Sequence, residues 1–167
     1  MIGINLGGLL LGACALGSAL NGGVFLAFSA FVLPALDRLP PGQAAAAMKA
    51  INLEVLQSLF MVLFLGTAAV AAVILAAGAW LWVGQARWIA TAAALVFLAG
   101  GFVVTVVANV PLNDRLGALE FQAAADFWPS YRVGWTLWNS VRTVACIASA
   151  AVASLAAIIA DGADRFG

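Results

Sequence analysis

Long runs of apolar residues, separated by short polar segments, extend along the whole chain. A helix that crosses a membrane needs about 20 mostly apolar residues, and four runs reach that length. These runs are longer than strands and alternate poorly, which disfavours a lipid-facing barrel. The pattern predicts an all-α fold, a four-helix transmembrane bundle in a single integral membrane domain, with spans at approximately residues 4–36, 55–83, 88–110 and 133–160.

The polar segments between the runs differ in length and predict the topology. Only Gly84–Arg87 separates the second and third runs, so a tight hairpin is expected there. The first link contains Pro40 and Pro41, which stop one helix before an Ala-rich run starts another. The second link contains a helical run, Leu112 to Phe127, that Pro129 should end. Four antiparallel spans place both short helical links on one side of the membrane, where they could cover the bundle as a lid.

Composition and charge support a protein embedded in lipid. Hydrophobic residues make up 65% of the 167 residues and charged residues only 8%, whereas soluble domains have roughly 25% charged residues. The bilayer is therefore an expected partner, and no basic face is available for nucleic acid. Basic residues are more frequent in the two long links, which favours a cytoplasmic location for them in a bacterial inner membrane.

The chain contains no histidine and two cysteines. Histidine is the usual general base near neutral pH and the commonest ligand of transition metals and haem. Cys14 and Cys146 lie in apolar runs without a CxxC spacing, which is typical of packing residues. We therefore expect no metal site and no cofactor.

Polar residues inside the apolar runs indicate a site, because lipid-facing polar groups are costly. Trp135, Trp138, Asn139 and Arg142 follow helical spacing and form one stripe of the fourth run. Pro111 cannot donate to the carbonyl of the residue four positions earlier, which leaves that carbonyl free. Most polar residues lie toward the link side of their helices, which predicts a pocket for a small apolar or aromatic ligand. The residues predicted to bind it are Asn21, Phe28, Asn52, Asn109, Asn113, Trp135, Trp138, Asn139 and Arg142.

Each of these residues also has a structural interpretation. Arg142 could clamp carbonyls of neighbouring helices, and Trp135 and Trp138 could lie at the membrane interface as aromatic anchors. Asn21 could bond two helices together, and the asparagines around Pro111 could cap a helix. A Gly-x-x-x-Gly pair in the first run fits packing within one bundle and leaves a homo-oligomer seam open as the alternative.

Several segments resemble one family of membrane proteins. The resemblance covers nearly the whole chain in order, and its more specific segments are Asn-Val-Pro-Leu-Asn and Trp-x-x-Trp-Asn-x-x-Arg-Thr. The family is the anthrone-oxygenase-like family of small four-helix membrane proteins, most of whose bacterial members have no assigned activity. The segments that carry the resemblance are Phe28–Leu36, Leu39–Pro41, Met48–Asn52, Phe64–Thr67, Asn109–Asn113 and Trp135–Thr143.

The resemblance implies oxidation of an anthrone to an anthraquinone by O₂ without a cofactor, as in some fungal members. We expect an anthrone- or quinol-like aromatic substrate, whose developing oxyanion Arg142, Asn139 and an asparagine of the third run could stabilise. Glu54 is the candidate base only if its face turns inward, since it lies roughly 200° from Asn52 on a helix. Otherwise the substrate's own acidity or a water must serve. The alternative is a non-enzymatic lipid- or quinone-binding protein, or a subunit of a larger membrane assembly; a transporter is disfavoured.

Overall fold

The protein is an all-α bundle. The computed structural model describes residues 6–166, and the side chains of residues 6–162. Three stretches of π-helix interrupt the α-helices without ending them. In chain order the elements are α1 (Leu6–Ala27), η1 (Phe28–Val32), α2 (Leu33–Leu36), α3 (Pro41–Leu56), α4 (Leu59–Leu81), α5 (Gly84–Val96), η2 (Phe97–Val103), η3 (Thr105–Asn109), α6 (Val110–Ala118) and α7 (Phe121–Phe166).

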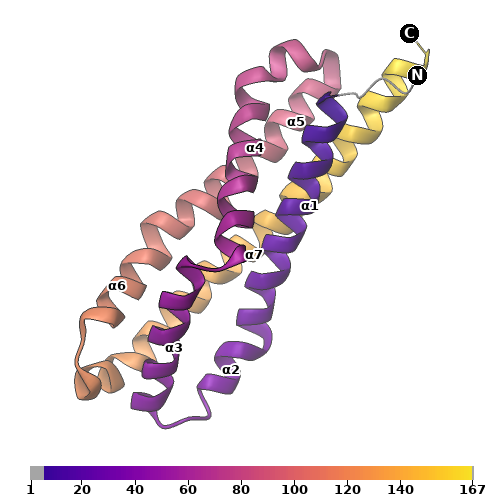
Figure 1. Cartoon of the computed structure of the whole chain (residues 1–167). Helices are drawn as coiled ribbons and strands as arrows, with labels where there is room; N and C mark the ends of the chain where they lie inside the picture. Colours follow the sequence, from indigo (N-terminus) through magenta and orange to yellow (C-terminus); the bar gives the residue numbers. More distant parts are fainter. Residues whose placement is uncertain (1–5, 167) are drawn as a thin grey trace.

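The connections alternate between the two ends of the bundle (Figure 1). The α4–α5 turn lies at the end where α1 begins and α7 ends, which we call the turn end. The α2–α3 and α6–α7 connections lie at the opposite end, the link end. Gly84 allows the turn to be this short, because its φ of 55° is a conformation that other residues rarely adopt. The prediction of an all-α bundle with both helical links on one side is confirmed.

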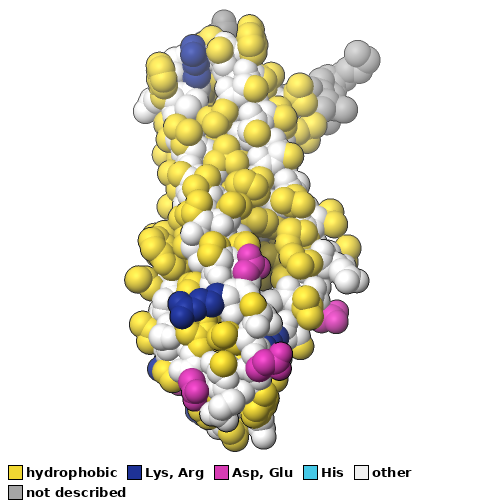
Figure 2. Space-filling model, turned by 90° about the vertical axis from the view of Figure 1, so that its left-hand side faces the viewer, with side chains coloured by type: hydrophobic (Ala, Val, Ile, Leu, Met, Phe, Trp, Pro, Cys, Tyr) yellow, Lys and Arg dark blue, Asp and Glu magenta, His cyan; other side chains and the backbone are white. Residues whose placement is uncertain are grey.

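Four helical stretches are long and apolar enough to cross a membrane: Leu6–Leu36, Leu59–Leu81, Gly84–Ala118 and Phe121–Gly162. Residues 6–36 and 55–86 carry no charged side chain, and residues 88–113 and 133–160 carry one, Arg142. Figure 2 shows most charged side chains of one face in the link half, a basic side chain at the turn end, and a largely hydrophobic surface between them. The chain is therefore an integral membrane protein, and the link end extends beyond its uncharged band.

The link helices run along the bundle and do not form a lid across its end. In Figure 1, α3 continues the line of α4, from which only Gln57 and Ser58 separate it. Ser58 has an extended backbone, and its hydroxyl donates to the carbonyl of Val55 at 2.7 Å. Likewise α6 continues the helix that begins as α5, and both link helices contact α7. The expected lid is wrong, because the apolar side chains of both link helices pack against α7 in one hydrophobic cluster.

Proline explains two of the π-helical stretches. Pro34 and Pro111 each follow a five-residue π-helix by two positions. A proline lacks an N–H and its ring collides with the carbonyl four residues earlier, so the preceding turn widens. The backbone N–H of Leu33 then bonds to the carbonyl of Phe28, and that of Val110 to the carbonyl of Thr105. The helices continue past both prolines, and in the stretch before Pro111 the widened turn ends at the buried Asn109.

Pro129 does not end a helix, contrary to the prediction. It lies inside α7, which runs without interruption through it. Pro129 itself is exposed, whereas Trp128, Tyr131 and Trp135 on the same helix are buried in one hydrophobic cluster. Burial of these large rings outweighs the loss of one helical hydrogen bond, whose cost is about 3 kcal/mol.

Two hydrophobic clusters form the core. The cluster toward the turn end includes Leu11, Phe64 and Phe97, and it joins α1, α4, α5 and α7. The cluster toward the link end includes Met48 and Tyr131, and it joins α2, α3, α6 and α7. The break at residues 57–58 lies between the two clusters along the same helical line.

The topology can be tested by cysteine labelling from one side of the membrane. Gln43 and Gln85 are exposed at opposite ends of the bundle, so Gln43→Cys and Gln85→Cys should react from opposite sides. The native Cys14 and Cys146 are buried and should not react, which provides the background control. Equal labelling of both introduced cysteines by an impermeant maleimide would contradict the arrangement. The labelled side also tests the predicted cytoplasmic location of the link end.

Candidate functional site

A cavity of about 770 Å³ lies between the two core clusters. Residues from all four helical lines form its walls, so that the cavity exists only in the assembled bundle. Most of the lining is apolar, and the polar lining residues are few. The uncharged polar residues on its wall are Asn52, Thr105, Asn109 and Asn113, and the ionisable ones are Lys49, Asp114 and Arg142.

Three phenylalanine rings form the apolar end of the cavity. Phe60 and Phe64 are nearly parallel, with their centroids 6.0 Å apart and their planes at 17°. Phe25 contacts both rings edge-on, at centroid distances of 5.8 and 6.2 Å. Flat apolar molecules are bound well between such faces and edges. This end of the cavity is therefore suited to an aromatic ring system.

Arg142 places a buried cation on the cavity wall. Its side chain is 5% exposed, and its guanidinium carbon lies 4.2 Å from the centroid of the Phe25 ring. Nη1 donates to the hydroxyl of Thr105 at 3.2 Å, and Nη2 donates to Oδ1 of Asn139 at 2.7 Å. Nε is buried and has no hydrogen-bond partner, and no carboxylate among residues 6–162 pairs with this guanidinium. A buried cation without a counter-ion is costly, and among the described residues two hydrogen bonds and the Phe25 ring stabilise this one.

Asn139 holds the guanidinium in place from behind. Its Nδ2 donates to the carbonyl of Phe25 and to the hydroxyl of Ser29, both at 2.6 Å. These two acceptors fix the amide so that Oδ1 faces Arg142. Asn139 is fully buried and does not line the cavity. It is a positioning residue that connects α1 to the cation on α7.

The two asparagines beside Pro111 also line the cavity. Asn109 is 1% exposed; its Nδ2 donates to the carbonyl of Trp135 at 3.3 Å, while its Oδ1 has no partner among the described residues. Oδ1 of Asn113 accepts from the Tyr131 hydroxyl at 2.9 Å and from Nε1 of Trp135 at 3.0 Å. Buried polar atoms are usually paired. The free Oδ1 of Asn109 can therefore accept a hydrogen bond from a ligand.

A comparison with protein families identifies the chain. The family model described as Anthrone oxygenase matches residues 55–152. The chain belongs to the anthrone oxygenase family. No match was found among curated proteins or among solved structures. The part that matches this family contains the cation and both asparagines beside Pro111, whereas α1 and most of α3 lie outside it.

Six of the nine residues predicted to bind a ligand line the cavity of this anthrone oxygenase family member. They come from η1, α3, η3, α6 and α7, so the topology gathers them as expected. Binding by these residues stays a prediction. The six are Phe28, Asn52, Asn109, Asn113, Trp135 and Arg142.

The other three predicted residues lie outside the cavity. Asn139 lies behind Arg142, as described above. Asn21 is buried between α1 and α4, where Nδ2 donates to the carbonyl of Gly17 at 2.8 Å and to the hydroxyl of Thr67 at 3.2 Å. It therefore bonds two helices, which was the structural interpretation. Trp138 is 41% exposed on the outer surface of α7, because it lies at the edge of the predicted stripe.

Three polar or charged lining residues were missed from the sequence, as were the apolar ones other than Phe28 and Trp135. Thr105 lies four positions before Asn109 and binds Arg142, a spacing that could have indicated it. Asp114 directly follows Asn113, and Lys49 lies three positions before Asn52 on α3. Glu54, the candidate base, is exposed and does not line the cavity, because Asn52 occupies the inward face. No group of three or more Cys, Asp or Glu residues suited to a metal ion is present among the described residues.

Proposed function

We propose that the cavity binds a flat aromatic compound of the anthrone or quinol class and holds it as its oxyanion for direct reaction with O₂, without a cofactor. The observation that carries the proposal is the unpaired guanidinium of Arg142 on the wall of an aromatic cavity. Membership in the anthrone oxygenase family supports the same substrate class. The three phenylalanine rings would bind the apolar body of the substrate, and the guanidinium would bind its oxygen.

The proposed reaction converts the methylene carbon of an anthrone to a carbonyl. Loss of one methylene proton gives the enolate, which transfers one electron to O₂ and then forms a carbon–oxygen bond with the resulting superoxide. The hydroperoxide loses its second carbon-bound proton as the oxygen–oxygen bond breaks. One oxygen atom of O₂ remains in the quinone and the other leaves as water, so that one O₂ is consumed for each anthraquinone.

Arg142 would act chiefly by stabilising the enolate oxygen. Fixed donors in a site with little water stabilise a developing oxyanion strongly, and loss of one such donor costs about 10²–10³ in rate. The Phe25 ring and the amide of Asn139 keep this guanidinium in one position before the substrate binds. The acidity of the methylene group then rises because its conjugate base is stabilised.

Asp114 is the carboxylate on the cavity wall, and we assign it as the acceptor of the methylene proton. It is exposed at the mouth of the cavity, so it can pass the proton to bulk water. General base catalysis contributes about 10²–10⁴ in rate.

Asp114→Asn is expected to slow anthrone oxidation by about a hundredfold, with partial recovery in Asp114→Glu. Glu54→Gln is the control, because Glu54 is a carboxylate outside the cavity. If Asp114→Asn kept the full rate, the methylene proton would be passing directly to water, which would contradict this role.

The test of the proposal is turnover by the purified protein in detergent. Anthrone is added, anthraquinone is followed by its absorbance, and O₂ consumption is recorded in the same sample. We expect a rate above that of a detergent blank, with equal amounts of O₂ consumed and anthraquinone formed. A rate equal to the blank would contradict oxidation of this substrate class.

Binding without turnover is the second candidate function, and the rim of the cavity favours it. Leu53 and Leu56 of α3 and Val110 of α6 are exposed and apolar, and all three line the cavity. Leu53 and Leu56 lie at the end of α3, beside the start of the uncharged residues 55–86, and α3 contacts α6. A lipid or quinone could therefore enter from the membrane. Native mass spectrometry that shows a co-purified quinone, together with turnover no faster than the blank, would favour this function.

A further inference from the structure

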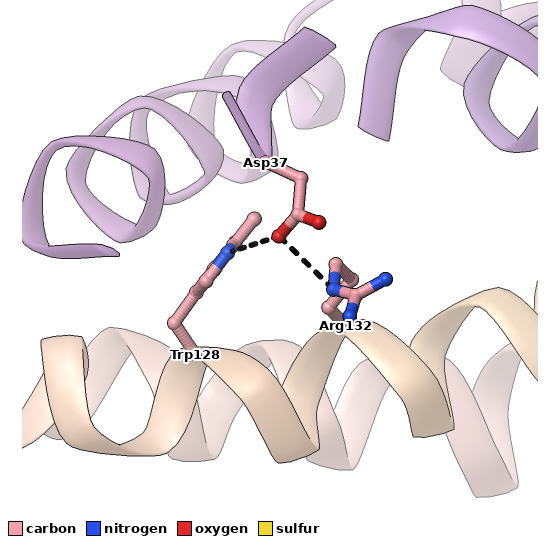
Figure 3. A network of polar contacts seen from close by, with 3 residues as sticks. All are labelled: Asp37, Trp128 and Arg132. Carbon is pink, nitrogen blue, oxygen red and sulfur yellow. Dashed lines mark hydrogen bonds and ion pairs between the residues drawn. The ribbon is translucent and has the colours of Figure 1, made fainter. Parts of the chain in front are cut away.

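A second polar site lies on the outside of the bundle, between α2 and α7. One carboxylate oxygen of Asp37, at the end of α2, pairs with Nε of Arg132 at 3.0 Å. The same oxygen accepts from Nε1 of Trp128 at 3.2 Å. Figure 3 shows both side chains of α7 directed at this oxygen, while the terminal nitrogens of Arg132 point away from it. Asp37 thus pairs with Arg132 on the Nε side, and the terminal N–H groups of Arg132 are directed away from this carboxylate.

A groove of about 310 Å³ surrounds this pair. Its lining includes Arg38 and Arg132 as cations, Asp37 as the single anion, and the hydroxyls of Ser29 and Thr136. The groove therefore carries one net positive charge. Arg38 is exposed and forms no ion pair with a described carboxylate. Two guanidinium groups and two hydroxyls form a set of donors that suits the oxygens of a phosphate group.

The groove lies at the boundary of the membrane. Asp37 and Arg38 directly follow α2 and the uncharged residues 6–36. On α7, Arg132 directly precedes the uncharged start of the fourth span at Val133. Phe31 precedes Asp37 within the first span, and Val133 and Leu137 follow Arg132 within the fourth; all three are exposed and apolar. Phosphate groups of lipids occupy this depth, and their acyl chains would extend along these apolar side chains.

We propose that the groove between α2 and α7 binds the phosphate group of an anionic phospholipid, with Arg38 and Arg132 as its donors. The site is separate from the cavity and does not depend on the proposed oxidation. It would hold a lipid of the leaflet at the link end against the α1–α7 face of the bundle. An anionic lipid is favoured over a zwitterionic one because the groove carries net positive charge, whereas a choline group would meet two cations.

The test is native mass spectrometry of the purified full chain with added lipid. Phosphatidylglycerol and phosphatidylcholine are added at equal concentration, and the protein should retain phosphatidylglycerol preferentially. In Arg38→Gln/Arg132→Gln, retention of phosphatidylglycerol should fall at least about fivefold, since each basic residue at the surface contributes about that factor. Retention of phosphatidylcholine should stay unchanged. Equal retention of the two lipids by the unmodified protein would overturn the proposal.

Three further measurements test whether the result is specific. Arg115→Gln removes a cation from the same end of the bundle, one that stacks on Phe127 at 4.3 Å, and it should not change lipid retention. Arg38→Lys/Arg132→Lys keeps both charges and should recover most of the preference, whereas a misfolded double variant would not be rescued by charge. Inorganic phosphate at millimolar concentration should fail to displace phosphatidylglycerol. Full displacement would overturn the lipid assignment and indicate a site for soluble phosphate.

Discussion

Replacing Arg142 with leucine is expected to slow anthrone oxidation by about a hundredfold to a thousandfold, because the enolate loses its buried counter-charge. The bundle should still insert and fold, since the hydropathy of the fourth span alone is sufficient and leucine suits the surrounding apolar groups. The rate is measured as anthraquinone absorbance, and the thermal unfolding midpoint in detergent is measured on the same sample. An unchanged rate would contradict the oxyanion role of Arg142.

A second substitution keeps Arg142 but gives its charge a partner within the protein. Asn139→Asp leaves Arg142 in place but puts a carboxylate oxygen where Oδ1 now accepts from Nη2 at 2.7 Å. The guanidinium then has an internal partner, and we expect a large loss of rate although the arginine is retained. Val144→Ala is the matched control on α7, because Val144 is exposed on the outside of the helix. Full activity in Asn139→Asp would show that the unpaired charge of Arg142 is not needed.

The fold could be predicted from hydropathy because its signal is long and continuous. Each span is a run of apolar residues without charge, and the short polar segment around Gly84 set the order of antiparallel helices. The prolines were harder to interpret, since a proline can end a helix, widen it or be tolerated within it. Pro111 widens its helix and Pro129 changes little, and the difference depends on which side chains the following turn buries.

The candidate site could be predicted only as a stripe of residues. On a helix, Trp138 lies about 60° from Trp135, whereas Arg142 lies about 20° from it. Trp138 therefore faces lipid while the other two line the cavity, a distinction that spacing alone does not make. The role of Asn139 depends on which end of its amide faces Arg142. The carbonyl of Phe25 and the hydroxyl of Ser29 decide that, and both come from a helix more than a hundred residues away.

Close contact between η2 and α7 predicts a large effect of substitution on stability. A Cβ added at Gly100 would collide with Cβ of Ala145, and its distance to Cα of Ala145 would be 3.8 Å. Neither atom is at the end of a flexible side chain, so the two helices would have to separate. Gly100→Leu is expected to lower the free energy of unfolding by about 3 kcal/mol, seen as a lower thermal midpoint in detergent. It should also lower activity, because Thr105, in η3 shortly after η2, accepts a hydrogen bond from Arg142 of α7.

Gly12 provides the matched control for this prediction. A Cβ at Gly12 would meet nothing within 4 Å, so Gly12→Leu should keep or raise the thermal midpoint, as leucine favours a helix by up to about 1 kcal/mol over glycine. The milder Gly100→Ala should lose less stability than Gly100→Leu, and adding Ala145→Gly should restore it by removing the colliding Cβ. Such rescue would show that the loss comes from this one contact. If Gly12→Leu and Gly100→Leu lowered the thermal midpoint equally, the close approach of η2 to α7 would not be the cause of the loss.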